Sequence, residues 1–188
     1  MLRYIFLLFL VSFFNLFSQN YTEYQVFQLN ALSGLDKFGV YIWETDSLLV
    51  EEGLTEDSLL IFVKNNLALP DSSLLSFIDA SKMNGSPSLE VEAKTIVSAD
   101  NSSVALYTAV RFIQDVILDR ERSIRHYSGI TWEADSLAIV PRYLLAEKTH
   151  GAILKLLDDF STDYFYINPP DTTSIQADTT RVDSLIYD

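Results

Sequence analysis

The sequence predicts an α+β fold: a single domain with a mixed or antiparallel sheet and helices mainly on one face. Residues 89–97 alternate apolar and charged side chains, as a strand with one buried face does. After the turn-like residues 98–103, apolar side chains at helical spacing favour an amphipathic helix up to residue 122 (Leu106, Ala109, Val110, Ile113, Val116 and Ile117). With no cysteine in 188 residues, the fold must be held by its core alone. We expect the other elements to pack around this βα unit.

Five segments precede this unit. Residues 21–32 are apolar without a clear period and are read as a strand or a packed lead-in. Residues 38–43 alternate and contain strand-forming residues, and residues 48–52 could return beside them as a hairpin. Thr55 is placed to cap a helix that extends to residue 67, and residues 74–78 suggest a short helix.

Three segments follow the unit. Residues 127–132 favour a strand, and residues 137–145 are a candidate hairpin partner in which Pro141 indicates an edge strand or a break. Residues 147–160 have the apolar face of a final helix. The predicted order is therefore roughly ββαβαβ with a C-terminal helix.

The ends of the chain differ from its centre. Residues 1–18 resemble a signal peptide, with Arg3 before an apolar run that is short for a membrane span; an uncleaved anchor is the alternative. Residues 21–167 form the predicted α+β domain, and residues 168–188 read as a flexible acidic tail. We therefore expect an exported protein, periplasmic or extracellular, which contacts a membrane only if the N-terminal segment stays uncleaved.

The charge limits the classes of partner. The formal net charge is −13, and loss of Arg3 with the leader leaves 12 basic residues against 26 acidic ones, or −14. Such a chain repels nucleic-acid phosphates and anionic lipid, so neither is an expected partner.

One hexapeptide pattern occurs twice, as Trp43-Glu44-Thr45-Asp46-Ser47-Leu48 and as Trp132-Glu133-Ala134-Asp135-Ser136-Leu137. One interpretation is a single interaction site that both copies form (Trp43, Glu44, Asp46, Trp132, Glu133 and Asp135). The simpler interpretation is two hairpins that use the same turn chemistry, because Asp and Ser side chains bond nearby backbone groups.

The sequence does not contain the usual catalytic motifs. Two histidines 24 residues apart and no thiol make a zinc site improbable, and no calcium loop is present. The six glycines are scattered singly, which excludes the common phosphate-binding loops, and no Gly-x-Ser-x-Gly elbow occurs. We therefore assign no catalytic, cofactor-binding or metal-binding residue and expect no cofactor.

The predicted order of elements from Val40 to Trp132 and two local features resemble the periplasmic domain of the biopolymer transport ExbD/TolR family. One feature is the Leu-x-Val-x-x-Gly-Leu-Thr-Glu-Asp-x-Leu run from Leu48 to Leu59, and the other is a strand that ends at Ala99-Asp100 and leads into an amphipathic helix. The resemblance implies an envelope domain that dimerises or binds partner proteins. Residues 2–17 lack that family's transmembrane Asp, so no functional residue is carried over.

Our leading hypothesis is a non-catalytic envelope domain that acts by protein–protein interaction, with a homodimer as one form of it. The first alternative is an exported hydrolase that uses carboxylates or a Ser-His pair. It requires Glu44, Asp46, Glu133 or Asp135 to meet in a concave pocket. The second alternative is a structural or adhesive module that uses exposed aromatic side chains.

Overall fold

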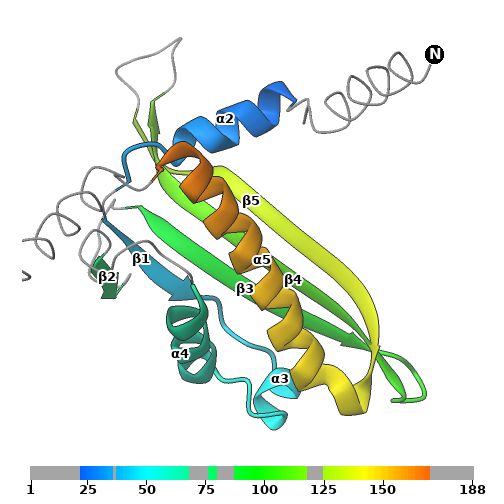
Figure 1. The fold of residues 1–188 in the computed structure, drawn as a ribbon. Helices are drawn as coiled ribbons and strands as arrows, with labels where there is room; N and C mark the ends of the chain where they lie inside the picture. Colours follow the sequence, from blue (N-terminus) through cyan, green and yellow to red (C-terminus); the bar gives the residue numbers. More distant parts are fainter. Residues whose placement is uncertain (1–21, 36, 68–75, 80–86, 118–124, 170–188) are drawn as a thin grey trace, which may run out of the picture.

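The computed structural model describes residues 22–35, 37–67, 76–79, 87–117 and 125–169 (Figure 1). In chain order the elements are α2 (Glu23–Ala31), β1 (Lys37–Ile42), α3 (Ser47–Glu51), α4 (Glu56–Asn66), β2 (Ser76–Asp79), β3 (Ser88–Val97), β4 (Ser103–Ile117), β5 (Arg125–Pro141), η3 (Arg142–Leu144) and α5 (Leu145–Ile167). The strands form one mixed sheet in the order β2-β1-β3-β4-β5. The predicted α+β class, with helices on one face of a mixed sheet, is confirmed.

The sheet has a parallel part and an antiparallel part. β1 pairs in parallel with both β2 and β3, whereas β3, β4 and β5 form an antiparallel meander. β4 pairs along its whole length with β3 or β5, and two register shifts interrupt its pairing with β5 near Ile113 and Val116. These long strands set the geometry of the molecule.

The core lies between the sheet and α5, which crosses β3, β4 and β5 in front of the sheet in Figure 1. Phe160 of α5 is fully buried at its centre. Its ring lies 5.9 Å from the rings of Phe38 and Phe112 and 5.1 Å from Trp132, and the Trp132 contact is edge-to-face. An aromatic cluster therefore joins the helix to three different strands.

Several predicted elements are confirmed. β1 and β3 are strands, and Leu89, Val91 and Ala93 point into the core as the alternation required. Thr55 caps α4 by accepting a hydrogen bond from the backbone N–H of Ser58 at 3.2 Å. The final helix is longer than predicted and runs through Ile167.

The helix predicted after residue 98 is wrong, because residues 103–117 form β4. Alternate side chains of β4 face α5 and are buried (Val104, Leu106, Thr108, Val110 and Phe112). The expected N-cap is instead a hairpin turn: Asp100 accepts hydrogen bonds from both hydroxyls of Ser98 and Ser102, and Asn101 has a left-handed φ of 60°. The second predicted helix of the ββαβαβ order is therefore a strand.

Four other segments also differ from prediction. Residues 47–51 form the helix α3 rather than a returning strand, because the Asp46 carboxylate caps it at the N–H of Leu49. The segment before β1 is the helix α2, and residues 76–79 form β2. Residues 125–141 are one continuous strand, not a hairpin, although Pro141 does end an edge strand as expected. The proposed leader and residues 170–188 lie outside the described residues.

The end of α5 is bonded to the turn that follows α2. The Asn168 side chain donates to the carbonyl of Leu32 and accepts from the N–H of Gly34, both at 2.9 Å. The Tyr164 hydroxyl donates to the carbonyl of Leu35 at 3.1 Å. These bonds hold the N- and C-terminal parts of the described domain together.

Candidate interaction surface

The sheet has a second face, opposite the helices, which no described helix covers. Cross-strand partners share a face, so the pairing register identifies its side chains. We call this set the open face: Tyr41 and Trp43; Glu90, Glu92, Lys94 and Ile96 of β3; Ala105, Tyr107, Ala109 and Arg111 of β4; Glu133, Asp135, Leu137 and Ile139 of β5.

Arg111 organises the centre of the open face. Its guanidinium donates to Glu133 through Nε at 2.8 Å, to Glu92 through Nη1 at 2.6 Å and to the Tyr107 hydroxyl through Nη2 at 2.8 Å. Lys94 forms a further ion pair with Glu92. The arginine thus bridges β3 and β5, the two strands that flank β4.

Burial and ion pairing shift the pKa values of Glu92 and Arg111 in opposite directions. Burial alone raises the pKa of Glu92, but hydrogen bonds from Lys94 and Arg111 outweigh it and leave the pKa below its ordinary value. Burial alone lowers the pKa of Arg111, and the bonds to Glu133 and Glu92 raise it further than burial lowers it. Both groups are therefore ionised near neutral pH, as a compensated network requires.

Two aromatic side chains lie beside this network. Tyr41 and Trp43 contact each other edge-to-face with ring centroids 5.7 Å apart, and the Trp43 indole donates to Glu90 at 2.8 Å. Each is about two-fifths exposed, at 42% and 43%. They give the open face a partly exposed aromatic border.

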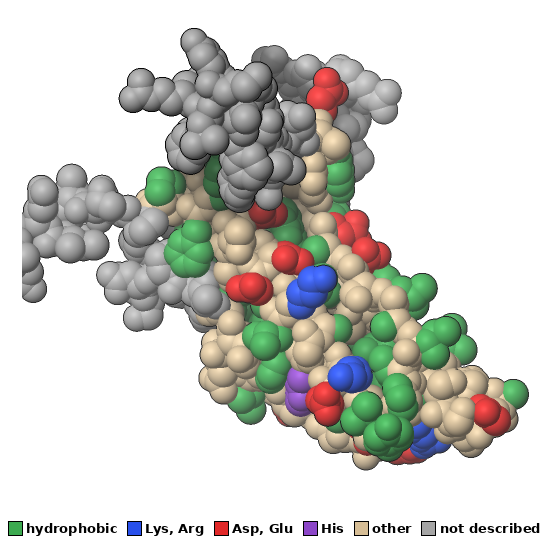
Figure 2. Space-filling model, turned by 45° about the vertical axis from the view of Figure 1, so that its right-hand side comes forward, with side chains coloured by type: hydrophobic (Ala, Val, Ile, Leu, Met, Phe, Trp, Pro, Cys, Tyr) green, Lys and Arg blue, Asp and Glu red, His purple; other side chains and the backbone are tan. Residues whose placement is uncertain are grey.

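The far end of the open face, near the β3–β4 hairpin, is apolar. Ile96, Leu137 and Ile139 are 75%, 75% and 80% exposed. Figure 2 brings the side of the molecule that carries β5 forward but still views the helical side of the sheet, where hydrophobic side chains also gather toward the lower end. Single exposed apolar residues are ordinary, but several at one end of the same sheet face mark a contact surface.

The structure brings together only part of the predicted paired site. Trp43, Glu133 and Asp135 all lie on the open face. Trp132 lies on the opposite face, where it is 2% exposed and donates its indole N–H to Asp163 of α5 at 2.9 Å. The two tryptophans therefore do not meet.

Asp46 and Glu44 lie apart from that group. Asp46 has a structural function: besides capping α3, its second oxygen accepts from the backbone N–H and hydroxyl of Thr95 at 2.8 and 2.7 Å. Glu44 is exposed in the segment between β1 and α3. The interpretation as two equivalent hairpins is also wrong, because residues 132–137 lie inside β5 whereas residues 43–48 lead from a strand into a helix.

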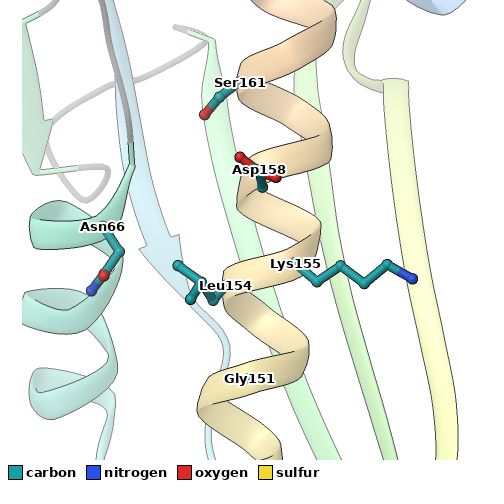
Figure 3. Close-up of a pocket in the computed structure, with 6 residues that line it drawn as sticks. All are labelled: Asn66, Gly151, Leu154, Lys155, Asp158 and Ser161. Carbon is teal, nitrogen blue, oxygen red and sulfur yellow. The ribbon is translucent and has the colours of Figure 1, made fainter.

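A shallow cavity of about 450 Å³ lies between α4 and α5 (Figure 3). It is lined by Asn66, Gly151, Leu154, Lys155, Asp158 and Ser161. The Ser161 hydroxyl is bonded to the Leu157 carbonyl of its own helix at 2.7 Å. Nearby, His150 stacks on Phe62, and burial lowers its pKa. None of the predicted site residues lines this cavity, and its lining does not form a nucleophile–base pair.

Two further findings concern the described part of the chain only. Within those ranges no three His, Asp or Glu side chains are grouped closely enough to hold a metal ion. Among the described helices, none combines the length and hydrophobicity that crossing a bilayer requires.

Comparison with known proteins gave no match to a family model, a curated protein or a solved structure. Sequence reasoning missed Arg111 and the apolar trio Ile96, Leu137 and Ile139. The available signal for the last two was the uncharged, continuously apolar stretch 137–140.

Proposed function

We propose that this protein is a non-catalytic domain that binds another protein through the open face. The observation that carries the proposal is the exposure of Ile96 on β3 and of Leu137 and Ile139 on β5, on either side of β4 on the same uncovered sheet face. Burying such side chains against a partner contributes about 25 cal/mol per Å² of apolar surface. Their removal from water can therefore drive association.

The charged centre of the open face supports the same function. Because Glu92 and Glu133 already bond to Arg111, a partner can cover them without leaving an unpaired carboxylate. Asp135 is exposed at the border between the charged and apolar parts. The partner surface that fits is apolar opposite Ile96 and Ile139 and basic opposite Asp135.

The proposed setting is the cell envelope or the extracellular space. Its support is the signal-like sequence of residues 1–18 and the resemblance of Leu48–Leu59 to the biopolymer transport family. The hydrolase alternative gains no support, because Asp46 and Glu133 are bonded on opposite faces of the sheet.

The test compares crosslinking partners of the full chain in native envelopes for three forms: wild type, Ile96→Lys and Ile61→Lys. Ile61 is the matched control, since it is 61% exposed but lies on α4, away from the open face. We expect one protein to crosslink with the wild type and the control and to be lost with Ile96→Lys. The same partner, once purified, should bind Ile96→Lys about tenfold more weakly in calorimetry.

Two results would count against the proposal. One is the recovery of no specific partner by the wild-type chain. The other is a partner whose binding is unchanged by Ile96→Lys. Because the Ile96 side chain is largely in solvent, its substitution should change the free energy of unfolding by no more than about 0.5 kcal/mol, so a folding defect does not confuse the comparison.

A further inference from the structure

The outer edge of β5 can be read from its hydrogen-bond pattern. The N–H of Arg142 donates to the carbonyl of Ser102 at 3.1 Å, next to the paired residues Ser103 and Pro141. In an antiparallel ladder the residues that bond to one neighbour alternate with those that face away from it. Even-numbered residues in this half of β5 therefore bond to β4, and odd-numbered residues direct their N–H and C=O groups outward.

Two independent features agree with this assignment. Pro141 is odd-numbered, so its missing N–H would have faced away from β4, as proline in a strand requires. The carbonyl of Glu133, also odd-numbered, accepts a hydrogen bond from the Gln28 side chain of α2 at 3.3 Å. Helix α2 thus occupies the edge at Glu133.

Beyond Glu133 the edge is free within the described residues. The backbone groups of Asp135, Leu137 and Ile139 face outward, and no described residue bonds to them. The stretch from Asp135 to Pro141 is about 20 Å long at 3.4 Å per residue. A free edge of this length, with two exposed apolar side chains, is a template for another strand.

We propose that the occupant is a second copy of this chain, paired antiparallel through β5 about a twofold axis at Ala138. The meander would then continue into the second copy as one ten-stranded sheet. In this register Leu137 lies opposite the partner's Ile139, and the reverse pair follows by symmetry. Asp135 lies opposite the partner's Pro141 and beside the partner's Arg142.

Charge favours a second copy at this place and not elsewhere. With a formal charge of −13, two chains repel each other over most of their surfaces. The segment from Ser136 to Pro141 carries no charge, and the residues that flank it, Asp135 and Arg142, have opposite signs. The twofold axis therefore pairs an uncharged stretch with its own copy, and Arg142 is already paired with Glu51 of α3 at 3.3 Å, so no like charges face each other along the ladder.

The free backbone groups select the register. An axis at Ala138 uses only Asp135, Leu137, Ile139 and the carbonyl of Pro141, none of which has another described partner. An axis at Leu137 would pair Glu133 with the partner's Pro141, where α2 already bonds the Glu133 carbonyl and proline offers no N–H. The Ala138 axis also sets Ala138 opposite its own copy.

Because the chain has no cysteine, one introduced thiol tests this register directly. In the proposed pairing the two Cα atoms at position 138 are about 4.5 Å apart, within the span of a disulfide. The full chain with Ala138→Cys should form a covalent dimer under mild oxidation. Ser136→Cys is the control, because its two copies lie four residues apart along the ladder, about 13 Å, and cannot be bridged.

Sedimentation of the cysteine-free chain tests the association itself. We expect a concentration-dependent dimer that tightens as salt screens the acidic charge, and Leu137→Lys should weaken it at least tenfold. Ile96→Lys lies on the open face but two strands from the edge, so it should leave the dimer intact.

The results that would overturn the inference are distinct from those that bear on partner binding. A wild type that stays monomeric at every concentration and salt level overturns it, as does a dimer that survives Leu137→Lys. If the Ser136→Cys variant forms a covalent dimer and the Ala138→Cys variant does not, the proposed register is refuted. Loss of the dimer in Ile96→Lys would instead place the contact on the open face.

Discussion

Removal of the guanidinium of Arg111 should expose how much the fold depends on its charge network. In Arg111→Met the side chain keeps an unbranched apolar stem, but Glu92, whose side chain is 9% exposed, loses its buried partner. Breaking a buried ion pair by removing one member costs about 3–5 kcal/mol. Because Lys94 still contacts Glu92 and Glu133 is one-third exposed, we expect the lower end, about 3 kcal/mol.

Urea unfolding monitored by tryptophan fluorescence measures this change. At a urea m-value of about 2 kcal/mol per M, the loss corresponds to a drop in the unfolding midpoint of about 1.5 M urea. The double variant Glu92→Gln/Arg111→Met should be more stable than Arg111→Met alone, because it no longer buries an unpaired carboxylate. That recovery separates the electrostatic cause from a packing defect.

The pH dependence gives a second check on the same network. The lowered pKa of Glu92 in the folded wild type contributes stability above the ordinary value of 4.5, and this contribution is lost as the pH falls through the folded pKa. Without Arg111, burial favours protonated Glu92, so the deficit of the variant should shrink below pH 4.5. An Arg111→Met protein within about 0.5 kcal/mol of wild type, or a deficit independent of pH, would refute the reasoning.

Three further outcomes are expected. Phe160→Ala should cost about 3–5 kcal/mol in urea unfolding, since the ring is fully buried among aromatic neighbours; a loss below 1 kcal/mol would mean that the cluster is not the core. Asp46→Ala should cost about 2 kcal/mol by removing the cap of α3 and the bonds to Thr95, and an unchanged stability would contradict both contacts. Hydrogen bonds from Ser98 and Ser102 lower the pKa of Asp100 to about 2, so the NMR titration of Asp100 should have its midpoint there. The stability that these bonds contribute should be lost as the pH falls from 3.8 through 2. Ser98→Ala should raise the midpoint, and a wild-type midpoint near 3.8 would show that the turn is not formed.

Secondary structure was predicted correctly from the sequence where one hydrophobic periodicity dominated the segment. Residues 88–97 alternate cleanly, and α5 carries a continuous apolar stripe, so both were predicted. Residues 103–117 carry apolar side chains toward both the core and the open face, for example Val110 and Ile113. Such a stretch matches a helical stripe as well as a strand. Its many β-branched and aromatic residues were the signal that could have decided for a strand.

Local polar chemistry was ambiguous for a related reason. Asp with a Ser one or two positions after it forms a helix cap at Asp46, a hairpin turn at Asp100 and an ordinary strand segment at Asp135. The side chain offers the same hydrogen bonds in each place, and tertiary packing decides which are used. For the same reason, the repeated hexapeptide could not show that Trp43 and Trp132 lie on opposite faces.

The bonds between Asn168 and the residues Leu32 and Gly34 place the C-terminal end of α5 beside the turn that follows α2. Segments that enter before α2 and leave after α5 join the domain at one pole, and Figure 1 shows the β3–β4 hairpin at the other. A domain anchored or fused at either terminus would be attached at that end. Ile96 and Ile139 would then lie at the end most distant from the support, where an approaching molecule meets them first.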